Sequence, residues 1–268
     1  MIKAALLFLI SLDLIIAADI NIYKIFSKSM RKKISFIVIT PKTYHMSDKK
    51  YNVVYLLHGY GWDNKIFIFP FPVKRLADKY DVIVACPDGA KSWYMDSPVK
   101  KKSTYETHIT KEVVTFTDRK LRTVRHKKGR AIVGFSMGGF GALYVAFRNK
   151  NIFGAAGSMG GGVDVMPFPK KWGLKKVLGN IKKYRQYWED HRIISVMHEL
   201  KNNDLAIMID CGLKDPFLDG NRELHNELLS KNIEHDYREG KGGHTIIYWL
   251  KSIEIQMEFF NDFFHADS

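Results

Sequence analysis

Short, continuous apolar runs that alternate with longer helical patterns most constrain the fold of this 268-residue chain. The runs are rich in Val, Ile and Leu and are not interrupted by polar residues, as in "VVYLL" and "RAIVGF". Such strands are buried on both faces, which is typical of a mostly parallel sheet covered by helices. The sequence therefore predicts one α/β domain. We expect strands at 34–39, 53–57, 82–86, 130–135, 153–158, 205–210 and 235–239, and helices at about 72–80, 104–123, 137–148, 216–231 and 246–264.

The segment from about 163 to 200 breaks this alternation. It is basic, aromatic and irregular, and between Lys170 and Arg192 it carries eight cations against two anions. No repeat, low-complexity tract or Pro/Ser-rich linker marks a domain boundary, so we interpret the segment as an insertion within a single domain. It either forms one wall of a binding pocket or is a helical excursion with no role in binding.

The first 18 residues have the pattern of a signal peptide. Lys3 precedes an apolar stretch at 4–16, which two alanines suited to cleavage follow. Asp13 interrupts the stretch, and a buried first strand or a membrane anchor is the alternative. The stretch is too short to span a bilayer. We therefore expect a secreted or periplasmic protein without stable membrane insertion, whose α/β domain occupies 19–268.

The formal net charge of +14 raises the question of a nucleic-acid or membrane-surface partner. The lysines form scattered pairs with no recognition motif around them, which favours a solvated surface and argues against a nucleic-acid partner. A basic face could still attract acidic polysaccharide. The pairs are Lys32–Lys33, Lys49–Lys50, Lys127–Lys128, Lys170–Lys171, Lys175–Lys176 and Lys182–Lys183.

The two cysteines of the chain, Cys86 and Cys211, each lie at the end of a predicted strand. This position favours small buried hydrophobic residues over a disulfide. No CxxC motif or closely spaced Cys/His pair accompanies them, so the sequence predicts no metal site.

The most informative motif is G-x-S-x-G, formed by Gly134, Ser136 and Gly138 in "GFSMGGFGAL". The motif alone is moderately specific, but the strand 130–135 ends directly before the serine and the helix 137–148 begins directly after it. A serine on such a turn is held in a strained conformation, and larger residues two positions away would collide. The helix N-terminus also directs N–H groups toward the serine oxygen. We predict that Ser136 is a nucleophile, because a glycine turn that only packs a helix on a strand needs no serine.

A serine nucleophile needs an acid and a base, which follow it in the order Ser, acid, His in α/β-hydrolases. His244, in "EGKGGHTIIYW", lies in a glycine loop between the last strand and the last helix and is the predicted base. Asp215, in "CGLKDPFLDGN", is the predicted acid, and Asp210 at the end of the preceding strand is the reserve candidate. Because Pro216 follows it, Asp215 could also cap a helix, and the two roles are compatible.

Two backbone N–H groups are expected to form an oxyanion hole. Met137 directly follows the nucleophile, and Tyr60 lies in "VVYLLHGYGWD", the loop after an early strand. His58 in that loop is expected to be structural. Ser158, in "AAGSMGGG", is expected to line the loop after the next strand.

Three aromatic residues, Trp62, Trp93 and Tyr94, follow strands on the side where the site is expected. Each could stack on an aromatic acyl group or a sugar ring, or could anchor the core. We carry them forward as candidate substrate-binding residues.

These motifs, in this order, resemble the esterase D family of α/β-hydrolases, which includes S-formylglutathione hydrolases, feruloyl and acetyl-xylan esterases and mycolyltransferases. The resemblance covers about 50–260. It implies the α/β-hydrolase fold and gives Ser136, Asp215 and His244 the roles predicted above. Pro216 departs from the family, in which an aromatic residue more often follows the acid. The matching stretches are "LLHGYGWD", "PDGAKSWYMDSP", "YETHITKEV", "GFSMGGFGAL", "DCGLKDPFL" and "GGHTIIYW".

The "HGYG" loop looks like that of the secreted esterase branch, which agrees with the predicted signal peptide. We therefore expect a serine esterase that acts on small acyl or hydroxycinnamoyl esters, including esters on plant polysaccharide. It needs no metal or organic cofactor. The alternatives are an acyltransferase to a sugar hydroxyl, an S-formylglutathione hydrolase and a non-catalytic carbohydrate-binding relative. The sequence does not predict an oligomeric state.

Overall fold

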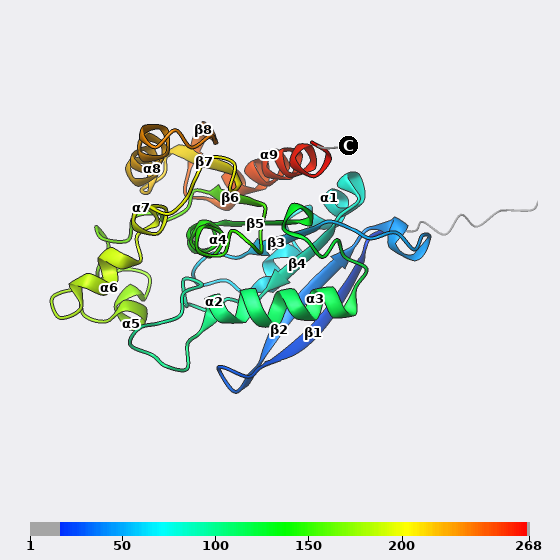
Figure 1. Cartoon of the computed structure of the whole chain (residues 1–268), viewed down its shortest axis with the longest axis horizontal. Coiled ribbons are helices and arrows are strands. Elements are labelled where there is room, and N and C mark those ends of the chain that lie inside the picture. The colour runs from blue at the N-terminus through cyan, green and yellow to red at the C-terminus, as the bar shows by residue number, and fades with distance from the viewer. Residues whose placement is uncertain (1–16, 267–268) are drawn as a thin grey trace, which may run out of the picture.

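An eight-stranded sheet runs through the protein, whose computed structural model describes residues 17–266 (Figure 1). The strand order is β1-β2-β4-β3-β5-β6-β7-β8. β1 and β2 form an antiparallel hairpin, β2 pairs antiparallel with β4, and all other pairs are parallel. The strands are β1 (Asp19–Ser27), β2 (Lys32–Thr40), β3 (Val53–Leu57), β4 (Ile83–Pro87), β5 (Arg130–Phe135), β6 (Ala155–Met159), β7 (Ala206–Lys214) and β8 (Asp236–Gly243).

Helices cover both faces of the sheet (Figure 1). α1 and α9 pack in one hydrophobic cluster with the sheet, whereas α3, α4 and α8 pack in the cluster on the other face. The predicted α/β fold is confirmed, and it places the loops that follow β3, β5, β7 and β8 at one edge of the sheet. The helices are α1 (Val73–Tyr80), α2 (Tyr105–Thr107), α3 (Val114–Lys120), α4 (Met137–Arg148), α5 (Leu174–Leu178), α6 (Arg185–Asp190), α7 (Ile193–Val196), α8 (Leu218–Ser230) and α9 (Ile246–His265).

The predicted elements match the observed ones closely, with one strand missed. Each of the seven predicted strands overlaps one of β2 to β8, and the predicted helix at 137–148 has the bounds of α4. The helix predicted at 104–123 is α2, a π-helical stretch at His108–Val113 and α3. β1 was missed because it is an edge strand, mostly exposed, whereas the prediction relied on continuous apolar runs.

The segment 163–200 connects β6 to β7 and carries α5, α6 and α7. Figure 1 shows these helices beyond α4, on the side of the molecule away from the β1–β2 hairpin. Trp188 and Ile193 are fully buried in the same cluster as α4, so the segment packs as part of the α/β domain.

The predicted signal peptide lies almost wholly outside the described residues. Ala18, at its predicted end, is buried, and its N–H donates to the Asp78 carboxylate at 3.1 Å. Within residues 17–266, no helix combines the length and the apolar character needed to cross a membrane.

Candidate active site

Ser136 lies on the sharp turn between β5 and α4. Its backbone has φ 56° and ψ −118°, a conformation that non-glycine residues adopt only under strain. The Ser136 N–H donates to the Met159 carbonyl at 3.1 Å, which ties the turn to the end of β6. The turn therefore presents the serine side chain at the carboxyl edge of the sheet, in front of the N-terminus of α4.

The glycines on either side of the turn are sterically required, as the motif predicts. A Cβ on Gly134 would lie 2.5 Å from the Gly138 carbonyl, and a Cβ on Gly138 would collide with the Leu57 carbonyl. Both obstacles are backbone atoms that cannot rotate away. β5 and α4 can approach β3 this closely only because these two positions have no side chain.

The structure brings Ser136, His244 and Asp215 together in one chain of hydrogen bonds. His244 Nε2 lies 2.9 Å from Ser136 Oγ, and His244 Nδ1 lies 2.8 Å from Asp215 Oδ2. A carboxylate only accepts, so Nδ1 carries the proton and Nε2 is left to accept from the serine hydroxyl. The Asp215 side chain is fully buried and that of His244 is 22% exposed, so a substrate reaches the serine and histidine but not the acid.

The loop after β7 aims Asp215 at the histidine. The register between β7 and β8 shifts between Gly212 and Lys214, and this irregularity precedes the acid. Asp215 Oδ1 accepts the Phe217 N–H at 2.9 Å, while Oδ2 faces His244. The Asp215 carboxylate thus fixes the turn that leads into α8 and also orients the imidazole. The N-cap residue of α8 is Phe217, not Asp215.

The reserve candidate, Asp210, points away from this site. It is buried within β7 and accepts hydrogen bonds from the hydroxyls of Tyr248 and Ser252, both on α9. Burial, with the hydrogen bond to Asp210, raises the pKa of the Tyr248 hydroxyl well above its usual value, so this hydroxyl remains a donor at neutral pH. Asp210 therefore anchors α9 to the sheet, and His244 has its hydrogen bonds with Asp215 and Ser136 instead.

Two aromatic rings, one from a loop and one from a helix, pack against the His244 imidazole. Phe217, in the acid loop, lies 5.1 Å from it with the ring planes at 76°, and Trp249, in α9, lies 4.8 Å away at 89°. These edge-to-face contacts restrict the ring to the orientation that both hydrogen bonds need. Sequence reasoning missed both residues, although an aromatic residue two positions after the acid was a usable signal.

The loop after β3 lies directly beside the serine. A Cβ on Gly59 would lie 3.3 Å from Ser136 Cβ, so the backbone that leads to Tyr60 passes next to the nucleophile. Among residues 17–266, the N–H groups of Tyr60 and Met137 donate to no other part of the chain. Both remain the predicted oxyanion-hole donors.

His58 holds this loop in place through its buried ring. Its ring is fully buried, Nδ1 lies 3.0 Å from the Gly59 carbonyl and Nε2 accepts the Gly89 N–H at 2.9 Å. The ring therefore joins the loop after β3 to the loop after β4, in the structural position expected of it.

Trp93 and Tyr94 are buried core residues, so the prediction that they contact substrate is corrected. Their exposed fractions are 1% and 0%. Trp93 Nε1 donates to the Trp172 carbonyl at 3.0 Å, and the Tyr94 hydroxyl donates to the His58 carbonyl at 3.1 Å. Both side chains hold neighbouring loops in place through these hydrogen bonds and do not line a pocket.

Ser158 and Trp62 differ in their access to solvent. Ser158 lies inside β6 and is fully buried, not in the following loop as predicted. Trp62 is 46% exposed in the loop after β3 and stays a candidate for substrate binding.

An aromatic wall, which we define as Phe168, Trp172 and Phe217, stands beside the histidine. Its ring centroids lie 5.0 to 5.2 Å apart. Phe168 and Trp172 come from the start of the 163–200 segment, and Phe217 contacts His244. A Cβ on Gly173, next to Trp172, would lie 2.8 Å from the Tyr60 hydroxyl. The start of the segment therefore lies beside His244 and Tyr60, and its role in binding stays a prediction.

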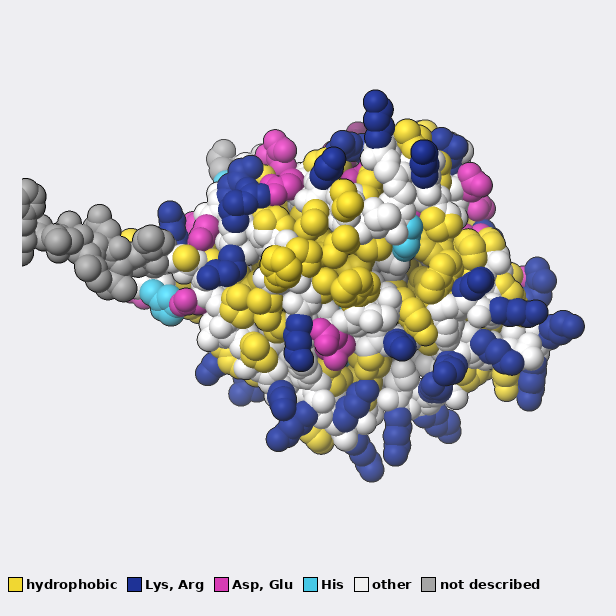
Figure 2. Space-filling model, turned by 180° about the vertical axis from the view of Figure 1, so that it is seen from behind, with side chains coloured by type: hydrophobic (Ala, Val, Ile, Leu, Met, Phe, Trp, Pro, Cys, Tyr) yellow, Lys and Arg dark blue, Asp and Glu magenta, His cyan; other side chains and the backbone are white. Residues whose placement is uncertain are grey.

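Large apolar side chains are also exposed on the loops around the site. Trp62, Ile68 and Phe69 follow β3, Leu213 lies at the end of β7, and Ile247 is in the first turn of α9, with Phe69 81% and Ile247 68% exposed. Figure 2 shows hydrophobic side chains gathered over the middle of one face, around a histidine, with Lys and Arg side chains toward the periphery. Exposed apolar patches of this kind are typical of binding surfaces.

No cluster of three or more His, Cys, Asp or Glu that could hold a metal ion exists in the described part of the chain. Cys86 and Cys211 are free and buried in β4 and β7, and burial raises the pKa of both thiols. They lie in strands of the sheet rather than at the serine.

Comparison with known proteins gives consistent matches over most of the chain. A model of the Esterase family, described as "Putative esterase", matches residues 27–259. An acetyl esterase of Caldicellulosiruptor saccharolyticus is 26% identical over 264 residues, which cover 90% of this chain and 96% of that protein. A solved ferulic acid esterase has a TM-score of 0.81 at 25% identity, covering 93% of this chain and 99% of that one.

An S-formylglutathione hydrolase from Agrobacterium tumefaciens has the same fold, with a TM-score of 0.79 at 19% identity, covering 92% of this chain and 96% of that one. The family match extends from β1 into α9 and includes Ser136, Asp215 and His244. The chain therefore belongs to the Esterase family and is a serine esterase with the α/β-hydrolase fold.

Proposed function

We propose that the protein hydrolyses small acyl and hydroxycinnamoyl esters, including esters carried on plant polysaccharide, through Ser136, His244 and Asp215. The observation that carries this proposal is the continuous hydrogen-bonded chain from a buried carboxylate to a serine on a strained turn. Such a chain activates a hydroxyl that is otherwise a weak nucleophile.

The reaction follows from this geometry in two halves. His244 Nε2 takes the Ser136 proton as Oγ bonds to the ester carbonyl carbon, while the Tyr60 and Met137 N–H groups stabilise the negative oxygen. Collapse of the intermediate breaks the bond to the alcohol oxygen, which takes the proton from Nε2. Water then attacks the acyl carbon and gives a proton to Nε2. Collapse of this second intermediate breaks the bond to Ser136 Oγ, which takes the proton back from Nε2 as the carboxylic acid leaves. Asp215 stabilises the imidazolium in both halves.

The surroundings of the serine support an apolar or aromatic acyl group. The aromatic wall and the exposed side chain of Trp62 offer flat apolar surfaces to an aryl ring. The relatives named as an acetyl esterase and a ferulic acid esterase act on acyl groups at the two ends of this size range. We extend their substrate class to this chain on that basis.

A fluorophosphonate probe tests the nucleophile directly. We expect the wild-type protein to be labelled and Ser136→Ala to show no labelling, because only an activated serine reacts with the probe. Ser158→Ala is the matched control, since this serine also lies among glycines but is fully buried; it should be labelled like the wild type. Labelling that persists in Ser136→Ala contradicts the mechanism.

A hydrolysis panel tests the substrate class. p-Nitrophenyl acetate, methyl ferulate, acetylated xylan and S-formylglutathione are compared at equal enzyme concentration. Turnover of the oxygen esters supports the proposal. Turnover of the thioester alone shows that the substrate class is wrong while leaving the nucleophile in place.

Trp172→Ala tests whether the aromatic wall binds the acyl group. We expect KM for methyl ferulate to rise by about fivefold to tenfold, the loss of one aromatic contact of roughly 1 to 1.5 kcal/mol. kcat/KM for p-nitrophenyl acetate should change less than twofold. Tyr184→Ala is the control, because this ring lies in the same segment but stacks on Tyr187. Equal effects on both esters would show that the wall does not contact the aryl ring.

A further inference from the structure

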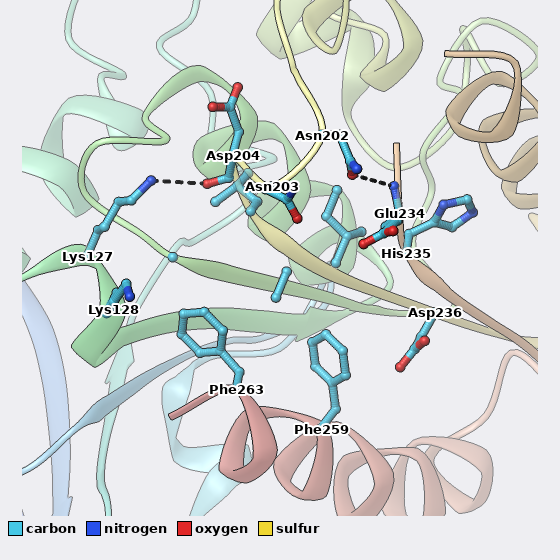
Figure 3. A pocket seen from close by; sticks show the side chains of 14 residues that line it. Lys127, Lys128, Asn202, Asn203, Asp204, Glu234, His235, Asp236, Phe259 and Phe263 are labelled. Carbon is cyan, nitrogen blue, oxygen red and sulfur yellow. Dashed lines mark hydrogen bonds between the residues drawn. The ribbon is translucent and has the colours of Figure 1, made fainter. Parts of the chain in front are cut away.

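A pocket of about 350 Å³ lies at the edge of the sheet opposite the Ser136 site (Figure 3). It is bounded by the loops that lead into β6, β7 and β8 and by the last turns of α9. Its volume is within the range of small-molecule sites. The proposed reaction uses none of the side chains that line it.

The distance between this pocket and the serine is set by the strands. Ala206, at the start of β7, lines the pocket, whereas Asp215 follows the end of the same strand. At about 3.3 Å per residue, the pocket and the acid loop are separated by on the order of 30 Å. A small ester cannot reach both, so any ligand that serves both places must be a polymer.

One side of the pocket is an aromatic platform made by Phe259 and Phe263. These residues are four apart on α9, so their side chains lie on the same helix face. Figure 3 shows the two rings side by side, turned toward the hollow. Phe263 also packs against Gly154, the residue before β6, because a Cβ there would lie 2.6 Å from its Cζ. The platform is thus preformed and half-buried.

The opposite side is polar and has unused hydrogen-bonding capacity. The side chains of Asn203, Glu234 and Asp236 have no hydrogen-bond or ion-pair partner among residues 17–266. The backbone that carries them is held in place, since Asn202 Oδ1 accepts the Glu234 N–H at 2.9 Å. Figure 3 shows Asn203 and Glu234 across the hollow from the phenylalanines, and Asp236 beside Phe259. They offer both donors and acceptors to a ligand.

The charges that line the pocket are nearly balanced, with two lysines and three carboxylates, in contrast to the net charge of +14 of the whole chain. Lys127 and Lys128 line it on one side, and Glu234 and Asp236 on the other. A third carboxylate, Asp204, also lines it and is paired with Lys150 at 2.7 Å, and Lys128 likewise has a partner of its own. A balanced set of this kind does not select an anion or a cation. It suits a neutral ligand that presents many hydroxyls and one apolar face.

We propose that this pocket binds a sugar unit of a neutral polysaccharide, with the C–H face of the sugar on Phe259 and Phe263 and its hydroxyls on Asn203, Glu234 and Asp236. The proposal rests on the proposed function, because the bound polymer is the one whose ester groups are hydrolysed. Binding at this pocket holds the polymer on the enzyme and raises the concentration of its esters near Ser136. It has no effect on esters that are not attached to a polymer.

Affinity electrophoresis tests this pocket without catalysis. The Ser136→Ala background is run in native gels that contain neutral arabinoxylan, polygalacturonate or no polymer. We expect the arabinoxylan gel to retard the protein, and the added double substitution Asn203→Gly/Asp236→Ala to reduce its apparent affinity at least fivefold. Both side chains are exposed and have no hydrogen-bond partner among the described residues, and glycine readily adopts the φ of 65° found at Asn203, so the fold should be unaffected. Glu227→Ala, on the exposed surface of α8, is the charge-matched control and should retain full retardation.

Each other outcome overturns the proposal. Absence of retardation in arabinoxylan, equal retardation of the double variant there, or an equal loss of retardation in polygalacturonate on the double substitution would show that the pocket does not bind neutral polysaccharide. With active enzyme, the double variant should release acetate from dilute acetylated xylan threefold to tenfold more slowly and hydrolyse p-nitrophenyl acetate at the wild-type rate. Failure of the proposed function is distinguishable, because wild-type enzyme would then not hydrolyse p-nitrophenyl acetate even if arabinoxylan is bound.

Discussion

Asp215→Asn is expected to lower kcat for p-nitrophenyl acetate by about 10⁴-fold while the protein stays folded. The amide preserves the shape of the carboxylate but offers an NH₂ group where Oδ2 now accepts from His244 Nδ1. The imidazole would then favour the tautomer with its proton on Nε2, which cannot accept the Ser136 proton. A loss of this size is typical when a triad acid is made neutral. Steady-state kinetics with circular dichroism as a check of folding measure the effect.

Asp210→Asn is the matched control, because Asp210 is a buried carboxylate within β7, the strand that leads to Asp215. Its bonds to Tyr248 and Ser252 hold α9 on the sheet, so we expect a loss of about 1–3 kcal/mol in the free energy of unfolding. kcat should stay within a few-fold of the wild type. The reverse pattern, with an active Asp215→Asn and an inactive Asp210→Asn, would assign the acid to Asp210 and contradict the proposed site.

The choice between these two acids shows where sequence reasoning reaches its limit. The position of Ser136 follows from local rules, because a strand, a helix and two glycines around a serine can form only a tight turn. The direction of Asp215 depends on the irregular pairing of β7 with β8 between Gly212 and Lys214. Such an irregularity re-aims every side chain after it and has no signature in composition or periodicity. The order of residues predicts that an acid lies there, but only the geometry distinguishes one acid from the other.

Tertiary packing also determines which aromatic residues lie in the core and which lie beside the site, a choice that sequence patterns do not settle. Trp93 and Tyr94 lie in a loop after a strand, where a ligand is expected, yet both have φ 57° and turn their rings into the core. Phe168 and Trp172 come from a segment without clear periodicity and nonetheless reach Phe217 beside His244. Local propensity cannot reveal these contacts because they join residues about 50 positions apart in the chain.

Gly138→Ala is expected to destabilise the protein strongly, in contrast to the same substitution elsewhere in the fold. The new methyl group would collide with the Leu57 carbonyl and would lie 2.8 Å from the His58 carbonyl. Relief requires α4 to move away from β3, which separates Ser136 from the loop of Tyr60. We expect the free energy of unfolding to fall by about 3 kcal/mol. For a domain of this size, Tm should then fall by roughly 6–12 °C.

The matched control is Gly220→Ala in α8, where the nearest atom would lie 3.4 Å from the new Cβ, an ordinary contact. Alanine costs less conformational entropy than glycine in a helix, so this variant should be more stable than the wild type by about 0.5 kcal/mol. Thermal unfolding followed by circular dichroism measures both variants. Gly138→Ala should also lose most of its activity toward p-nitrophenyl acetate at temperatures where it is folded, whereas Gly220→Ala should retain it. If Gly138→Ala unfolds at the wild-type Tm, the contact between α4 and β3 is looser than described, and the glycine is not what holds Ser136 against the oxyanion loop.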